Sequence, residues 1–448
     1  YASALYSSKY QLTPSIPIYN EDGSYHTGFQ NNGGINPLYE NSVDSNYARL
    51  ARTMASAKAA YHILDGLKLS TIFTVDYSLN KDFFFYSPDG KDGEATQGSG
   101  QMMMIERMSY TSQTNLAYNK TFGKHNINAV LAYEVMKYDY EDMYGEKQVY
   151  GQTLNPSLDN GAKPADLTNT RQEDAMVSYV GSLNYGYNDK YYAGFSFRRD
   201  GSSRLAPDTR WGNFWAVSAS WRLSQENFMK PWEDVVSDMK LRASYGVNGN
   251  LPTGYYGYHG TYPTGAFYNG KPAPWEDAIA NPDLTWEKTL SYDVGVDVNF
   301  LNHWNLSFDY WYSRTYDILG ARSKSVPTSF SLSLPDENYG EIHAQGVDFQ
   351  LGYQGKSKDF TYHGNFTLSY GWNKVIQKDY SENAQWIDIP EGKSTSYITG
   401  YVFDKIIRTQ DELDAFNAEH PDYLHNGLSP ELGMMVYKDI SGPNDTPD

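Results

Sequence analysis

Residues 284–372 contain a succession of segments in which apolar and polar side chains alternate with a period of two. In the first of them every even position from 290 to 300 is apolar, and the positions between are Ser, Asp, Gly, Asp and Asn. The alternation returns at 304–312, 347–353 and 362–372. Successive side chains of a β-strand point to opposite faces of the sheet, so each segment has one apolar and one polar face. Long segments of this kind, joined by alternately short and long connections, are typical of a membrane barrel.

Hydropathy is compatible with such a barrel, although hydrophobic residues make up only 40% of the chain and the mean hydropathy is -0.64. A membrane helix needs a run of roughly 18 apolar residues, which is not found here, but in a barrel half of each strand faces water. The chain has 41 Tyr and 10 Trp. These residue types suit the bilayer interface, but aromatic residues also favour the strands of soluble proteins.

Charge and cysteine content exclude several classes of function. The formal net charge is -18, which argues against nucleic acid as a partner because no basic surface is available. Cysteine is absent, so the chain has no disulfides, thiol nucleophiles or Cys-based metal sites. This composition fits an exported bacterial protein. The sequence begins at Tyr1 without a signal peptide, and we expect it to be a fragment.

The connections between the expected strands fall into two alternating classes. Residues 1–46 are expected to be a loop region of extracellular type, and residues 47–448 to be part of a barrel with long extracellular loops. Residues 47–62 are rich in Ala, yet a strand is favoured because a tight turn and an alternating segment follow directly. About fourteen strands are readable on this pattern. Short turns are expected near 64, 124, 188, 302 and 356, and long loops at 81–104, 141–172, 199–212, 248–283 and 318–338.

Soluble β folds explain the pattern less well. A propeller would repeat at a fixed period of about 40 residues with shared motifs, and none is present. Sandwich strands average about five or six residues, whereas the strands expected here need ten or more. The fold class that the sequence predicts is therefore all-β, a large antiparallel transmembrane β-barrel.

Several short motifs are more specific than the periodicity. Residues 197–204 read Phe-Arg-Arg-Asp-Gly-Ser-Ser-Arg, and residues 239–250 read Met-Lys-Leu-Arg-Ala-Ser-Tyr-Gly-Val-Asn-Gly-Asn. Together with six further stretches, and in this order along the chain, these two motifs resemble the barrel half of the SusC/RagA family of TonB-dependent outer-membrane transporters. The further stretches are 210–212, 220–224, 226–229, 281–289, 338–342 and 435–440.

The resemblance implies a 22-stranded barrel integral to the bacterial outer membrane, closed by an N-terminal plug that TonB pulls to drive uptake. It also implies a SusD-like lipoprotein as a lid, and oligosaccharides or, in some members, peptides as cargo. We expect the plug, the TonB-contacting box and the terminal strands to lie outside this chain, so energy coupling rests on analogy.

The sequence shows no recognisable catalytic or metal-binding motif, and we expect neither an enzyme nor a cofactor. The nine His show no metal-ligand spacing such as H-E-x-x-H, and neither a nucleophile elbow nor a phosphate-binding Gly loop is present. The acidic tail at 439–448 lacks the ligand spacing of an EF-hand, and solvated surface is favoured over a calcium site there. The sequons at Asn119, Asn305 and Asn365 fall on expected strands and are interpreted as chance.

Two groups of residues stand out, a polar group expected to line the lumen and an aromatic group in a loop that is the best candidate for contact with a ligand. The first is polar and is expected on the inward faces of the strands, where it would line a wetted lumen: Asp293, Asp297, Asp309, Asp348, Asn365, Ser369, Arg198 and Arg222. A soluble sheet would solvate one face with the same residues. The second is aromatic and falls in the loop at 248–283, where rings could stack on sugars, contact a partner or pack on the loop itself: Tyr255, Tyr256, Tyr258, Tyr262 and Trp275, with Phe267 and Tyr268 beside them.

Outer-membrane nutrient import is the function that these observations favour, with the lipid bilayer, a SusD-like lipoprotein, TonB and an oligosaccharide or peptide as partners. Two alternatives remain open. One is a passive, porin-like barrel without plug or lid, and the other is a soluble secreted glycan-binding β protein.

Overall fold

The structure is a computed structural model in which twelve strands form one antiparallel sheet. Hydrogen-bonded neighbours follow one another along the chain, in the order β1 to β8 and then β11 to β14. Contacts divide the chain into two compact units, Tyr1–Trp215 with Thr253–Tyr256, and Ala216–Pro252 with Gly257–Asp448. The described residues are 16–27, 36–151, 155–262, 267–276, 278–321, 332, 334–378, 389–424, 427–438 and 440.

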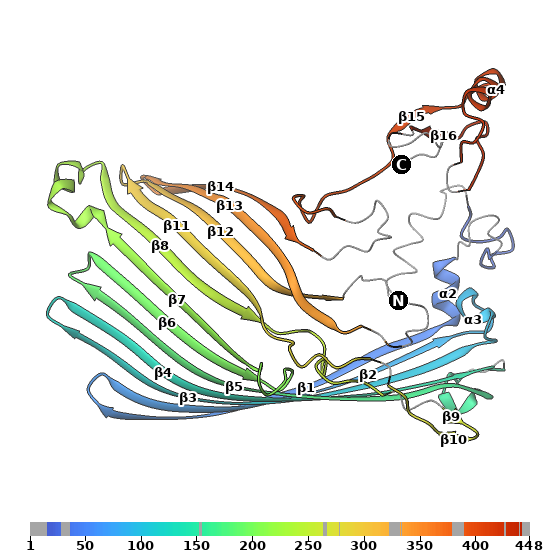
Figure 1. The fold of residues 1–448 in the computed structure, drawn as a ribbon, viewed down its shortest axis with the longest axis horizontal. Helices are drawn as coiled ribbons and strands as arrows, with labels where there is room; N and C mark the ends of the chain where they lie inside the picture. Colours follow the sequence, from blue (N-terminus) through green and yellow to red (C-terminus); the bar gives the residue numbers. More distant parts are fainter. Residues whose placement is uncertain are drawn as a thin grey trace. The chain divides into compact units, whose positions relative to one another are not determined.

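The first unit contains the longest strands, which lie side by side in Figure 1. A strand of about 9–11 residues crosses a bilayer, so the strands of 20 to 25 residues in this unit extend well beyond it. The strand favoured over a helix at 47–62 is confirmed. The strands are β1 (Ser45–Leu64), β2 (Leu67–Tyr86), β3 (Ser99–Phe122), β4 (His125–Gln148), β5 (Lys163–Tyr187), β6 (Tyr191–Ser202) and the first part of β7 (Trp211–Arg222).

The loops expected at 81–104 and 141–172 are much shorter, because β2 to β5 continue into them. Residues 83–86 and 102–104 are runs of aromatic residues and of Met. Such runs do not alternate, so the sequence pattern misses them, but the backbone ladder continues through them and pairs Phe83 with Met102. At this end of the unit Phe83, Phe85 and Tyr150 form a small buried cluster.

Short helices accompany the first unit. Helix α2 (Pro37–Val43) lies within residues 1–46, where only loop was expected. Its start is well defined, because Pro37 occupies the first turn and the Asn36 side chain accepts hydrogen bonds from the backbone N–H groups of Leu38 and Tyr39. The other two are α3 (Lys91–Glu94) and η1 (Leu158–Asn160).

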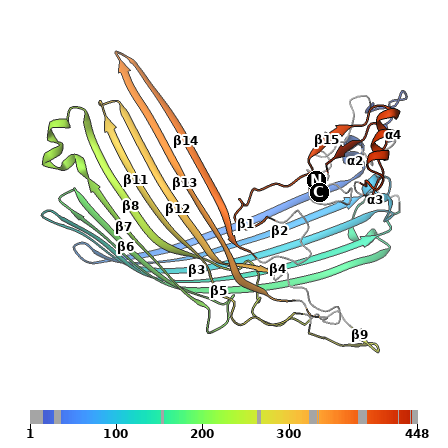
Figure 2. The same cartoon turned by 45° about the horizontal axis from the view of Figure 1, so that its top comes forward.

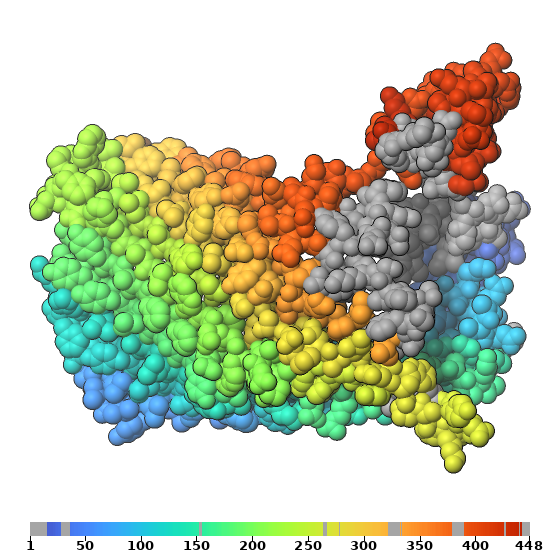
Figure 3. All heavy atoms as spheres, viewed as in Figure 1, coloured from blue at the N-terminus to red at the C-terminus, as the bar shows by residue number. Residues whose placement is uncertain are grey.

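The second unit contains the alternating segments on which the prediction was based. Its strands lie side by side in Figure 2, and the short turns expected near 302 and 356 connect them. In Figure 3 the atoms of this unit run from yellow-green to orange, and many of them lie on the face turned to the viewer. The strands are β8 (Val236–Asn250), β11 (Glu287–Phe300), β12 (Trp304–Ala321), β13 (Asp336–Ser357) and β14 (Phe360–Gln377), with η2 (Leu223–Gln225) and η3 (Asn227–Trp232) before β8 and the small strands β9 (Phe267–Tyr268) and β10 (Lys271–Pro272) before β11.

Residues beyond β14 form a separate small fold. Strands β15 (Phe403–Ile406) and β16 (Met435–Tyr437) pair with each other, and helix α4 (Gln410–Glu419) lies between them in the chain. Ile407, Phe416, Tyr423 and Val436 form its core. The large sheet therefore has twelve strands rather than about fourteen. The acidic tail at 439–448 lies outside the described residues except for Ile440.

Candidate functional site: the polar face of the sheet

The two faces of the second unit differ in chemistry across all its strands. Apolar positions meet apolar positions in register, as in the pairs Val296 with Phe308 and Phe349 with Leu368. On this outer face Phe308 and Leu368 expose 40% and 55% of their surface. A sandwich would bury such residues against a second sheet, and among the described residues no such layer covers them. The outer face is therefore suited to lipid.

Aromatic side chains gather at both ends of this apolar band. At the short-turn end Trp304 packs on Tyr353 with ring centroids 4.6 Å apart. Toward the other end Tyr292 stacks on Tyr312 at 5.0 Å. Trp304 and Tyr312 stand eight residues apart on the same face of β12, which corresponds to about 27 Å of extended strand. Because barrel strands tilt by about 35–45°, this length spans roughly 20 Å of height, close to the apolar band of about 25 Å that transmembrane barrels carry between two aromatic girdles.

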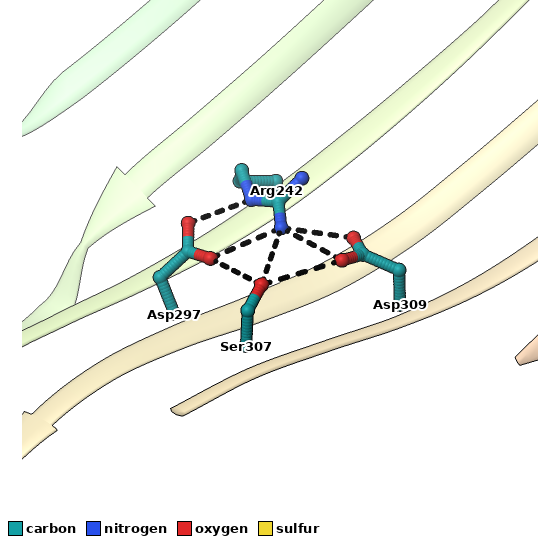
Figure 4. A network of polar contacts seen from close by, with 4 residues as sticks. All are labelled: Arg242, Asp297, Ser307 and Asp309. Carbon is teal, nitrogen blue, oxygen red and sulfur yellow. Dashed lines mark hydrogen bonds and ion pairs between the residues drawn. The ribbon is translucent and has the colours of Figure 1, made fainter. Parts of the chain in front are cut away.

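An arginine joins three strands on the opposite, polar face (Figure 4). Arg242 of β8 donates from Nε to Asp297 Oδ2 of β11 at 2.7 Å, and from Nη2 to Asp309 Oδ2 of β12 at 3.1 Å. Ser307 Oγ donates to Asp297 Oδ1 at 2.8 Å and completes the network. A guanidinium can bridge two carboxylates because its donors form a rigid fork. The side chains of Arg242, Asp297 and Asp309 all remain partly exposed to solvent.

The network depends on a glycine in the central strand. Gly295 stands opposite Arg242 on one side and opposite Asp309 on the other. A β-carbon at this position would collide with the Asp309 carboxylate and lie 3.0 Å from Arg242 Nη2. The missing side chain therefore opens the space through which Arg242 reaches across β11.

The first unit repeats this chemistry on its own polar face. Arg198 of β6 donates from Nε to Asp200 at 2.7 Å and from Nη2 to Ser178 of β5 at 2.9 Å. It also forms an ion pair with Glu134 of β4 at 3.3 Å. Asp200 and Ser178 are buried, so the network is a fixed part of the wall rather than a mobile surface pair.

The polar residues predicted to face inward lie where the alternation placed them. Asp309 pairs in register with Asp348, and Asp348 with Ser369, so one row of polar groups crosses three strands. Arg222 forms an ion pair with Asp238 at 2.7 Å. Arg242 was missed as a candidate. Its position between Leu241 and Ala243 marks it as polar-facing, but no signal in the sequence says which carboxylates lie one and two strands away.

The aromatic loop candidates do not form a single cluster within either unit. Tyr255 and Tyr256 belong to the first unit, and Tyr258, Tyr262 and Trp275 to the second. Tyr255 lies over the Arg204 guanidinium at 4.2 Å and accepts a hydrogen bond from its Nη2 at 2.9 Å. Tyr256 contacts the backbone of Glu173 through its hydroxyl. These two rings therefore anchor their part of the loop.

The other three loop aromatics differ in exposure, and Tyr258 is half-buried. Tyr258 packs on the neighbouring His259 ring at 4.0 Å. Tyr262 and Trp275 expose 60% and 55% of their surface, and within the described residues neither makes a ring contact.

A group of carboxylates next to β1 was not expected from the sequence. Carboxylate oxygens of Glu40, Asp44 and Asp92 lie within 4.8 Å of one another. Burial raises the pKa of Asp44 to about 6, although its carboxylate accepts a hydrogen bond from the Ser87 N–H. Three carboxylates supply only part of the roughly six to eight oxygens that Ca²⁺ takes. Asp92 is far from Glu40 in the chain, so no ligand spacing could reveal the group.

The described helices include none that is both long and apolar enough to span a membrane. A sheet with a lipid-suited outer face, two aromatic girdles and an ion-paired polar face defines the wall of a membrane-spanning β-barrel.

A comparison with known protein families shows to which family of barrels the chain belongs. A family model described as "TonB dependent receptor-like, beta-barrel" matches residues 2–410. The chain belongs to this family, whose members are integral to the outer membrane, and its similarity to SusC and to RagA confirms the resemblance inferred from the motifs.

Three relatives illustrate the similarity. TonB-dependent receptor P3 of Formosa agariphila is 30% identical over 386 residues, which cover 83% of this chain and 38% of the relative. TonB-dependent receptor SusC of Bacteroides thetaiotaomicron is 25% identical over 82% of this chain and 39% of the relative. The RagAB peptide importer in its "closed-closed" state superposes with a TM-score of 0.75 at 19% identity, over 87% of this chain and 44% of that chain. The chain thus spans less than half of the length of these relatives.

Proposed function

We propose that the chain forms part of the wall of a TonB-dependent importer that takes up oligosaccharides or, as a second choice, peptides. The observation that carries this proposal is the contrast between the two faces. The outer face exposes Phe308 and Leu368 to lipid, whereas the inner face carries ion-paired networks centred on Arg198 and Arg242. A wetted, ion-paired wall suits the passage of a polar solute.

The partners follow from the same proposal. A SusD-like lipoprotein covers the end of the barrel where the long loops lie, and TonB acts through a plug domain outside residues 1–448. The described face offers hydrogen-bonding groups and aromatic rings, and the activity proposed for it is capture and passage of a solute.

The loop aromatics belong to the capture step in this proposal. Tyr262 and Trp275 are the most exposed of the five candidates and are proposed to contact cargo or the lid. Tyr258 lies beside them in the chain. Tyr255 and Tyr256 contribute by holding the loop against Arg204 and Glu173.

Uptake by living cells tests the proposal. The gene for the full-length protein is deleted and then restored, and uptake of fluorescent oligosaccharides and peptides is measured with TonB present and absent. We expect uptake that requires both the protein and TonB. Uptake that persists without TonB supports the passive, porin-like alternative, and recovery of the full-length protein in the soluble fraction without detergent contradicts the barrel.

A further inference from the structure

Trp311 is an aromatic residue on the polar inner face of β12. It occupies an odd position, so it lies on the same face as Asp309 and opposite to Tyr310 and Tyr312. The other odd positions from 305 to 313 in this strand are Asn, Ser, Asp and Ser. A large indole in this row is not required by lipid contact, because the lipid lies on the other side of the sheet.

Two glycines make room for the indole against the wall. Trp311 pairs in register with Gly346 of β13, and Gly346 pairs with Gly371 of β14. A β-carbon at Gly346 would stand 2.6 Å from Trp311 Cζ2 and 2.8 Å from Cε2, and one at Gly371 would stand 3.4 Å from Cζ2. The ring therefore extends sideways across β13 toward β14 and rests on glycine backbone.

The Trp311 indole is half-buried, and the described residues make no ring contact with it. No described aromatic ring stacks on it and no described cation lies over it, although such contacts are frequent elsewhere in the sheet. Its Nε1–H also has no acceptor within the part of the chain that the structure describes. A half-buried indole whose Nε1–H has no acceptor among the described residues can act as a platform for a flat ligand.

Carboxylates surround this platform. Asp293 stands directly opposite Trp311 in the β11–β12 ladder, Asp309 precedes it by two positions, and Asp348 flanks Gly346. Asp309 is paired with Arg242, whereas Asp293 and Asp348 form no ion pair with any described residue. Free carboxylates beside an aromatic face accept hydrogen bonds from ligand hydroxyls and repel anionic groups.

We propose that Trp311, with Asp293 and Asp348, forms a binding subsite for a neutral pyranose ring on the inner wall of the barrel. The C–H face of the sugar packs on the indole while its hydroxyls donate to the carboxylates at the rim. This inference rests on the proposed import function and makes it more specific, because it selects neutral oligosaccharides over peptides and over acidic glycans. The glycines at 346 and 371 contribute by leaving room for the ring against the wall.

Binding to the purified full-length protein in detergent tests the subsite. Maltoheptaose, cellohexaose and xylohexaose are the neutral probes, and an oligogalacturonate is the anionic control, each titrated by calorimetry. We expect at least one neutral probe to bind and the anionic probe not to bind. Trp311→Ala should weaken the binding of that neutral probe by about tenfold, and Trp311→Phe should weaken it less, because a smaller ring retains part of the stacking surface.

Two further variants separate the subsite from general damage to the barrel. Trp372→Ala removes an indole from the outer face of β14, one residue after Gly371, and should leave binding unchanged. Gly346→Ala keeps Trp311 but places a methyl group where the ring now lies, and should weaken binding as Trp311→Ala does. Folding of every variant is checked by its heat-modifiable mobility on gels.

The subsite is overturned if none of the three neutral probes binds, or if folded Trp311→Ala binds a neutral probe as tightly as the unchanged protein. It is also overturned if oligogalacturonate binds best. These results leave TonB-dependent uptake of another cargo untouched, so failure of the subsite is distinguishable from failure of the import function, which the cell uptake measurement decides.

Discussion

Gly295 and Asp309 face each other across the β11–β12 ladder, and the Asp309 carboxylate fills the space that any side chain at Gly295 would need. We predict that Gly295→Ala destabilises the full-length barrel, because the methyl group displaces both Asp309 and the Arg242 guanidinium. Inserting a group into a filled site of this kind costs about 1–3 kcal/mol. Thermal unfolding in detergent, followed by circular dichroism, measures the effect.

Gly364→Ala provides the matched control for Gly295→Ala. Gly364 also lies in a strand of the second unit, β14, but a β-carbon there would meet nothing within 4 Å. We expect Gly364→Ala to leave the melting temperature unchanged. Equal melting temperatures for Gly295→Ala and the unchanged protein would show that the Arg242 network shifts without loss of stability.

Arg242 forms side-chain ion pairs with two neighbouring strands, β11 and β12. Arg242→Ala leaves Asp297 and Asp309 as two neighbouring carboxylates without their shared cation, and we expect a loss of about 1–3 kcal/mol in unfolding free energy. Arg242→Lys should recover only part of it, because an ammonium is a point charge and cannot donate to both carboxylates in the same fork geometry. Chemical denaturation of the two variants, compared at one ionic strength, gives the difference. A lysine variant as stable as the unchanged protein would contradict the bridging role.

The period-two alternation was enough to predict the strands of the second unit and the face on which each side chain lies. Asp297, Asp309 and Asp348 occur on the polar face because alternation leaves a strand residue only two directions to point. The pairing of Arg242 with carboxylates on the next two strands was not predictable, since it depends on strand register and on the space above Gly295. The local sequence around Arg242 determines neither the register of the strands nor the space above Gly295.

The ends of the long strands in the first unit also escaped prediction. Phe83, Phe85 and Tyr150 pack together in the buried cluster beyond the stretch that the bilayer requires. Outside the bilayer a strand has no reason to keep one face apolar and the other polar, so the runs at 83–86 and 102–104 look like loop. Their assignment to strands depends on the partner strand, as in the pairing of Phe83 with Met102.

The contact between Tyr255 and Arg204 predicts a local effect on the loop. Arg204 also forms an ion pair with the buried Asp174 at 2.7 Å, so Tyr255 rests on a guanidinium that is itself fixed. Tyr255→Ala removes the stacking and the hydrogen bond, and we expect amide exchange at 253–258 to accelerate by roughly tenfold. Tyr262→Ala is the control, because its ring is largely exposed. Hydrogen exchange followed by mass spectrometry reports both, and equal exchange in the two variants would mean that Tyr255 does not anchor the loop.

The raised pKa of Asp44 leads us to predict that local stability depends on pH. Burial, aided by repulsion from Glu40 and Asp92, raises the pKa of Asp44 to about 6 in the folded protein, against about 3.9 in an unfolded chain. The folded state therefore favours the protonated acid, and stability falls as pH rises from about 4 to about 6 and stays low above that range. The expected loss is about 1–2 kcal/mol after allowance for solvent screening.

Asp44→Asn isolates this effect. The amide oxygen can still accept the hydrogen bond from the Ser87 N–H, but it does not ionise. The protection factors of amides around α2, which are corrected for the intrinsic pH dependence of exchange, should therefore no longer change between pH 4.5 and pH 7. Asp65→Asn serves as the control, because the Asp65 side chain is 91% exposed and its removal should leave the pH dependence in place. A pH dependence that survives in Asp44→Asn would assign it to Glu40, whose pKa burial also raises.

The connection between β7 and β8 predicts a contact with the lipid interface. Phe228 and Trp232 of η3 expose 59% and 60% of their surface, and Phe228 packs against Trp221, the last aromatic residue of the outer face of β7. Aromatic rings at this level of a barrel lie among lipid headgroups. In liposomes, lipids brominated near the headgroup should therefore quench Trp232 more than lipids brominated near the chain ends. Comparison with Trp232→Phe isolates its signal, and Trp286→Phe is the control because Trp286 is only 3% exposed. Quenching that does not decrease in Trp232→Phe would place η3 in water, away from the bilayer.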